Sequence, residues 1–136
     1  MRRSRNQRRR GWARRDAEAA VAATALTALL GDAYLAGDGA ALARLLGPDV
    51  HLVVDRGGGG AALPVAAGPA CAVALLRCVL GEPSTLRLEA RPMNGRSGLV
   101  ASRGGQVVAV AVPSGTAGAV DHLWVVADPA KLQHWG

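Results

Sequence analysis

The sequence is poor in aromatic residues, and it contains a single lysine. Its 136 residues include no phenylalanine, and aromatic residues make up only 3% of the chain. A core must therefore be built from alanine, valine and leucine, and hydrophobic residues of all kinds reach 50%. That fraction is too high for a chain that is disordered throughout, and the length favours one domain.

Acidic residues are absent from residues 1–15, which contain eight arginines. This segment carries a formal charge of +8. Because the net charge of the whole chain is +6, residues 16–136 carry −2. The sequence predicts a disordered arm over 1–15 and a near-neutral globular domain over 16–136. The arm is either a salt-dependent binder of nucleic acid backbones or a solvated tail. The predicted nucleic-acid residues are Arg8, Arg9, Arg10, Arg14, Arg15 and Trp12, whose ring would stack on a base.

Cysteine and histidine are also scarce, with two and three copies. Cys71 and Cys78 lie seven positions apart in a predicted helix, about 10 Å by helical rise, which exceeds the reach of a disulfide. We expect both to be small buried core residues, and we expect no metal site and no cofactor. This cysteine usage is compatible with a cytoplasmic protein.

Long hydrophobic runs are missing, since none reaches the roughly 18 residues of a membrane span. We therefore expect no membrane partner. Residues 1–15 and the apolar stretch 19–31 present the alternative of a secretory signal. Asp16 and Glu18 interrupt that junction, and the apolar residues after them have the spacing of a helix face, both of which favour a folded helix.

Hydrophobic periodicity predicts helices early in the chain and strands late. A long helix over about 16–36 would carry Val21, Leu26, Leu29, Leu30 and Tyr34 on one stripe. Further helices are expected over 40–46, 69–80 and 130–135, and strands over 50–55, within 61–67, and over 85–91, 98–102, 106–112 and 119–127. This order predicts an α+β fold in which one curved, mostly antiparallel sheet wraps a long helix, and it argues against a doubly wound nucleotide-binding fold.

Three strings in the chain resemble a known family. Residues 49–55 run into Arg56 and four glycines, residues 93–100 hold an Asn-Gly turn and a strand, and residues 125–134 close with Asp-Pro-Ala-Lys-Leu-Gln-His. Together they resemble the SnoaL-like, cystatin-like barrels related to nuclear transport factor 2, and most closely the C-terminal extension of extracytoplasmic-function sigma factors. The resemblance spans residues 25–135 and implies a conical barrel with a cavity between sheet and helix.

The resemblance implies a regulatory or protein-interaction domain that docks on a sigma factor or RNA polymerase, with a small apolar ligand as a gate. The interface residues it implies are Asp55, Gly57, Gly58, Gly59, Asp128, Pro129, Lys131 and Leu132. The chain departs from the family at Gly60, where a basic residue is usual, at Asp128, where asparagine is usual, and in lacking the promoter-reading regions of a sigma factor. The alternatives are a small enzyme (an isomerase, cyclase or hydrolase) and a ligand-binding barrel without chemistry.

Polar side chains inside such a cone are the candidates for chemistry. His51 and Asp55 share one face of a predicted strand, and with His122 they could form a general base with an orienting carboxylate. The predicted pocket comprises Tyr34, His51, Val53, Asp55, Arg91, His122 and Trp124. The alternatives are that Asp55 caps the glycine loop and that His122 is a wall residue.

Two further patterns have competing interpretations. Arg87, Glu89 and Arg91 alternate along a strand, as in a solvated sheet face with an ion pair or in an anion site. Glycines 57–60 lack the spacing and lysine of a phosphate loop, so a docking loop is favoured. The apolar strand 106–112 is compatible with a homodimer through the outer face of the sheet.

Overall fold

The computed structural model describes residues 2–57, 65–115 and 118–135. Its elements, in chain order, are α1 (Arg2–Leu35), α2 (Gly39–Leu45), β1 (Leu46–Asp55), β2 (Val65–Ala67), α3 (Pro69–Leu80), the 3-10 turn η1 (Pro83–Thr85), β3 (Leu86–Met93), β4 (Arg96–Arg103), β5 (Gln106–Ser114), β6 (Val120–Val126), α4 (Pro129–Leu132) and the 3-10 turn η2 (Gln133–Trp135). The predicted α+β order, with helices early and hairpins late, is confirmed.

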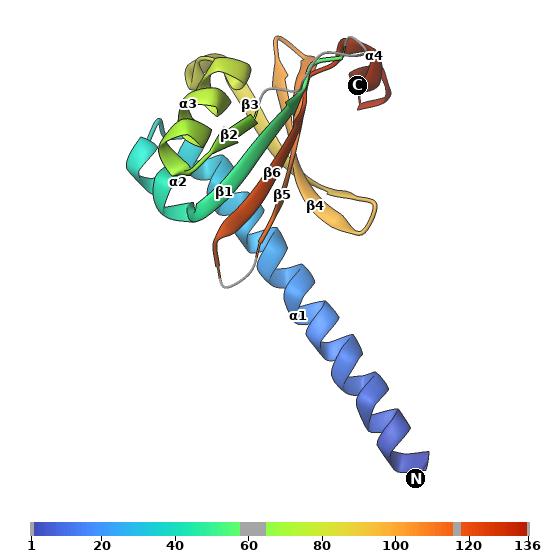
Figure 1. Cartoon of the computed structure of the whole chain (residues 1–136). Coiled ribbons are helices and arrows are strands. Elements are labelled where there is room, and N and C mark those ends of the chain that lie inside the picture. Colours follow the sequence, from blue (N-terminus) through green and yellow to red (C-terminus); the bar gives the residue numbers. More distant parts are fainter. Residues whose placement is uncertain (1, 58–64, 116–117, 136) are drawn as a thin grey trace.

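The strands form one curved sheet in the order β2-β1-β6-β5-β4-β3 (Figure 1). Strand β1 runs parallel to β6, and every other neighbouring pair is antiparallel. The two-residue turns Asn94-Gly95 and Gly104-Gly105 connect β3 to β4 and β4 to β5 with positive φ angles. Such turns suit the right-handed twist of a hairpin, and they explain the glycines at these positions.

Helix α1 crosses the inner face of the sheet with its C-terminal half. Leu26, Leu30 and Tyr34 follow one another at intervals of four residues and are buried. They pack with inner-face residues of the strands, including Leu52 and Leu123. Val21 and Leu29, which were expected on the same stripe, are instead exposed: Val21 lies on the opposite side of the helix, and Leu29 lies to the side of the buried residues.

The outer face of the sheet carries a second, smaller hydrophobic cluster. It is formed by Met93, Val100, Val110 and Leu132, with Val107, Val112, Val126 and Trp135 packed against it. Helix α4 and η2 cover this cluster at one end of the sheet (Figure 1). Both faces of the sheet are therefore partly apolar, so an apolar residue on a strand can belong to either face.

The N-terminus differs from the expectation of a disordered arm. Helix α1 begins at Arg2 and extends away from the body of the protein (Figure 1). Among the described residues, the segment Ala13–Leu35 is long and apolar enough on average to cross a membrane by length and composition alone, and 22% of its 18-residue window is buried. It holds the charged residues Arg14, Arg15, Asp16, Glu18 and Asp32, so it is no uninterrupted apolar run. The division of the chain at residue 15 stays a prediction.

Helix α3 also differs from the expectation. Its buried residues are Ala72, Val73, Leu76 and Leu80, whereas Cys71 and Cys78 are exposed free thiols. The prediction that both cysteines belong to the core is therefore wrong. The helix is apolar almost all round, so periodicity does not single out its buried side.

Candidate docking site

The candidate site lies where β1 and β6 end. These strands are parallel neighbours, so their carboxyl ends meet at the same edge of the sheet. The backbone N–H of Ala127 donates to the carbonyl oxygen of Asp55 at 2.7 Å and extends the pairing beyond the strands. Gly57, which follows β1, and the α4 segment that follows β6 are thereby brought together.

Asp55 is the centre of this cluster. It is only 8% exposed, and one carboxylate oxygen accepts from the backbone N–H of Gly57 at 3.0 Å. The other oxygen accepts from the Lys131 ammonium at 2.5 Å. These contacts supply the favourable partners that a buried carboxylate requires.

The ion pair perturbs both groups in the direction that favours their charged forms. The hydrogen bond from Lys131, with a further one from Gly57, lowers the pKa of Asp55 below its usual value. The hydrogen bond to Asp55 raises the pKa of Lys131. The lysine side chain remains 59% exposed, so it joins two segments of the chain while it presents a cation to solvent.

Gly57 and Asp128 make a close contact at the rim of the cluster. Gly57 has a φ of 81°, and a Cβ atom built there would lie 2.6 Å from the Cγ atom of Asp128. Asp128 in turn caps α4, because its side chain accepts from the backbone N–H of Ala130 at 3.1 Å. A glycine is therefore required at position 57 for two independent reasons, its backbone conformation and its neighbour.

The structure brings most of the implied interface residues together. Asp55, Gly57, Asp128 and Lys131 form one cluster, and Pro129 is exposed beside it. Leu132 is a correction, because it is 6% exposed and packs in the outer-face hydrophobic cluster, so it supports α4 rather than meeting a partner. Gly58 and Gly59 lie outside the described residues.

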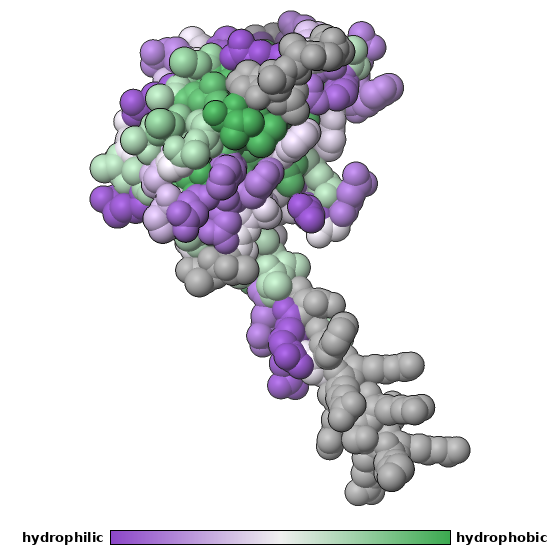
Figure 2. Space-filling model, in the orientation of Figure 1, coloured by the Kyte–Doolittle hydropathy of each residue, from purple (hydrophilic) through white to green (hydrophobic). Residues whose placement is uncertain are grey.

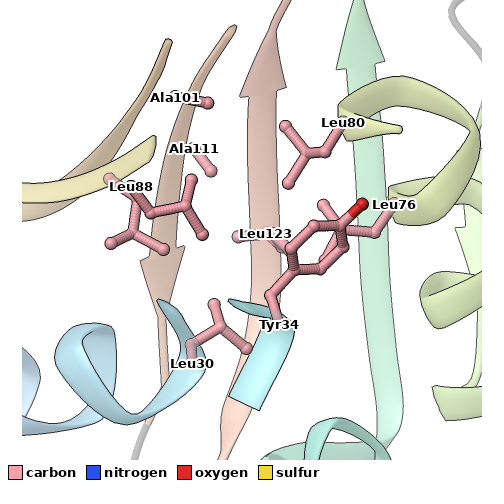
Figure 3. A pocket seen from close by; sticks show the side chains of 9 residues that line it. Leu30, Tyr34, Leu76, Leu80, Leu88, Ala101, Ala111 and Leu123 are labelled. Atoms are coloured by element: carbon pink, nitrogen blue, oxygen red, sulfur yellow. The ribbon is translucent and has the colours of Figure 1, made fainter. Parts of the chain in front are cut away.

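The cone between α1, α3 and the sheet is almost filled. Its void measures about 10 Å³, which is the lower limit for a single water molecule. The lining side chains converge on it from both helices and four strands (Figure 3). They are Leu30, Tyr34, Leu76, Leu80, Leu88, Leu99, Ala101, Ala111 and Leu123.

Tyr34 contributes the single polar side-chain atom of that lining. Its hydroxyl donates to the carbonyl oxygen of Gly81 at 2.5 Å, at the end of α3. Burial raises the pKa of the phenol, partly opposed by the nearby Arg103 and Arg77 cations. Tyr34 was predicted as a pocket residue, and it is the one member of that predicted set that lines the void.

The other predicted pocket residues lie elsewhere. His51, Val53 and Asp55 occupy the outer face of β1, because the alternate residues Val50, Leu52 and Val54 are the ones buried against the helices. On β6, His122 and Trp124 likewise point outward, and Trp124 is 38% exposed. The prediction that these side chains line the cone is therefore wrong.

Arg91 lies on the edge strand β3, away from the cone. It donates to the Glu89 carboxylate at 2.8 Å, and Arg87 approaches the same carboxylate at 3.9 Å. These ion pairs run along one exposed strand rather than across strands. Arg91 also borders an open groove of about 670 Å³ beside α1.

The proposed His–Asp pairing does not form. His51 and Asp55 are four residues apart on one strand, about 13 Å by strand rise, and the Asp55 carboxylate is already engaged by Lys131. His51 is instead the register neighbour of His122. Among the described residues, no three His, Cys, Asp or Glu side chains are grouped closely enough to hold a metal ion.

Solved structures share this architecture. The extracytoplasmic function sigma factor SigJ of Mycobacterium tuberculosis matches with a TM-score of 0.60 and 24% identity, over 82% of this chain and 44% of that one. The chain has a cystatin-like fold, like these solved structures. No family model and no curated protein sequence matches it.

Two smaller proteins show the same cystatin-like fold along most of their length. A protein assigned as a ketosteroid isomerase, from Kribbella flavida, matches with a TM-score of 0.58 and 14% identity, over 79% of this chain and 78% of that one. A protein assigned as a polyketide cyclase, from Xanthomonas campestris, matches with a TM-score of 0.56 and 18% identity, over 85% and 95%. The chain thus spans less than half of the sigma factor but most of these two proteins.

Proposed function

We propose that this protein is a regulatory interaction module that docks on a sigma factor or RNA polymerase during transcription initiation. The observation that carries the proposal is the Asp55–Lys131 ion pair, which ties the end of β1 to α4 and leaves the lysine at the surface. Two of the three strings that resemble the sigma-factor extension thereby become one surface. The likeness to SigJ is in agreement with this assignment.

The cone offers little support for the enzymatic alternative. Its lining has one titratable group, the Tyr34 phenol, and that group already donates to a backbone carbonyl. General acid–base chemistry needs a group within reach of a bound substrate, and a void of about 10 Å³ has no room for one. A ligand that gates the module would have to open the cone, so we keep docking as the primary function.

Binding to purified transcription proteins tests the proposal. The immobilised protein is titrated with RNA polymerase core and with an extracytoplasmic-function sigma factor, both from the genome that encodes this chain. We expect saturable binding to one of them. Lys131→Ala removes the exposed cation and breaks its ion pair with Asp55, so it should weaken binding at least tenfold, about 1.4 kcal/mol.

Arg87→Ala is the matched control, because it also removes an exposed cation but lies on β3, away from α4. It should bind as the unmodified protein does. Absence of binding to both partners at micromolar concentrations refutes the proposal. Equal losses in Lys131→Ala and Arg87→Ala would place the contact, if any, outside the Asp55–Lys131 cluster.

A further inference from the structure

The N-terminal half of α1 projects from the body as a basic helix. Residue Leu26 is the first buried position on α1 among those described, and residues 17–25 are exposed. The 24 residue-to-residue steps from Arg2 to Leu26 correspond to about 36 Å of helix by the standard rise. Figure 1 shows the N-terminal end of α1 extending clear of the sheet, whereas Ala19, Ala20, Ala23 and Thr24 border a groove shared with the strands.

Charge is segregated onto that projection. Residues 1–15 hold eight arginines and no acidic residue, while the remainder of the chain carries −2. Every one of these cations is an arginine, whose planar guanidinium binds phosphate oxygens with two parallel hydrogen bonds. Hydrophilic residues also mark the described part of the helix where it leaves the body (Figure 2).

We propose that this projecting helix binds the phosphodiester backbone of duplex DNA by lying in the major groove. Helical periodicity distributes the eight arginine positions all round the axis rather than along one stripe. A helix in the major groove, which is about 12 Å wide, has a phosphate strand on each side. Cations on opposite sides of the helix can therefore each meet a strand.

The same distribution disfavours a membrane surface as the partner. A helix that lies in a bilayer interface needs one broad apolar face opposite its charges. Trp12 is the one large apolar residue between Arg2 and Arg15, and arginines occupy positions all round it. The helix also extends from the body opposite α4 (Figure 1), so the DNA contact leaves the proposed docking site free.

Salt dependence of DNA binding tests the proposal with the full chain. Binding to a fluorescent 20-base-pair duplex is measured by anisotropy between 50 and 200 mM salt. If about five phosphates are neutralised, the slope of log K against log salt is about −4.5, a loss of about 500-fold over this range. Changing Arg8, Arg9, Arg10, Arg14 and Arg15 to Gln leaves three arginines on the projection, so the slope should be no steeper than about −2.7.

A matched variant separates the helix from net charge. Changing Arg44, Arg56, Arg87, Arg91 and Arg96 to Gln removes five exposed arginines from the body and should leave the slope unchanged. Equal slopes in the two variants overturn the proposal. Binding that is tighter to duplex RNA or to phosphatidylserine vesicles than to duplex DNA also overturns it. So does tighter binding to single-stranded DNA, if that binding is lost in Trp12→Ala.

Discussion

Tyr34 tests whether α1 is seated in the sheet as described. The residue is 3% exposed, and its ring fills the cone between α1, α3 and the strands. Its hydroxyl satisfies the carbonyl of Gly81. Tyr34→Phe keeps the ring and leaves that carbonyl without its partner, whereas Tyr34→Ala removes the ring and opens a cavity in the core.

The two substitutions should differ clearly in magnitude. Loss of the hydroxyl should lower the free energy of unfolding by about 1 kcal/mol. Truncation to alanine should lower it by about 4 kcal/mol, the central value for a large aromatic side chain in a core. For a domain of this size these losses correspond to about 4 °C and about 15 °C in Tm.

Thermal unfolding followed by circular dichroism measures both effects. Leu29→Ala is the control, because Leu29 lies on the same helix but is exposed. It should shift Tm by less than about 2 °C, as substitutions at surface positions usually do. If Tyr34→Ala shifts Tm no more than Leu29→Ala does, the helix is not packed on the sheet. The cone, and the fold built around it, would then be wrong.

Three further predictions follow from the described contacts. The ion pair should stabilise the protein between about pH 4 and pH 10. Its contribution is lost as pH falls below the usual pKa of 3.8 through the lowered pKa of Asp55, and as pH rises above 10.5 through the raised pKa of Lys131. Urea titrations of Asp55→Asn should therefore show no loss of stability from this pair at acid pH. Cys71 and Cys78 should both react with a maleimide in the native protein at rates close to those of the unfolded chain; protection of either contradicts the exposed face of α3. A homodimer through the outer face of the sheet should dissociate in Trp124→Arg, as measured by sedimentation velocity. If the unmodified protein is monomeric in the same measurement, that interface is ruled out.

Local sequence signals predicted most of the elements. Asp38 caps α2 through a hydrogen bond from the backbone N–H of Ala41, and an aspartate directly before a helical segment is a local signal for such a cap. Glycine and proline pairs marked the ends of helices and hairpins, because their backbone preferences act within a few residues. Strand boundaries agree with the expected ones within a few positions.

The faces of these elements were less predictable. On β1, both sets of alternate residues contain valine, so alternation alone leaves open which set meets the helices. The outer face of the sheet has its own hydrophobic cluster, and the strand register places Trp124 beside Val112 of that cluster. On α3, Arg77 was the one polar side chain in the helix, and its exposed position was the available signal that Cys78 beside it faces solvent.

By itself, the sequence determined the order of helices and strands, the turns between them and the concentration of arginine in residues 1–15, because these depend on neighbouring residues or on composition. Tertiary structure alone decided that Asp55 meets Lys131, 76 positions away, and that the cone closes around leucines instead of histidines. Those outcomes depend on the parallel pairing of β1 with β6 and on which face of the sheet α1 covers. Both depend on contacts between residues far apart in the sequence, and the packing of the whole domain makes them.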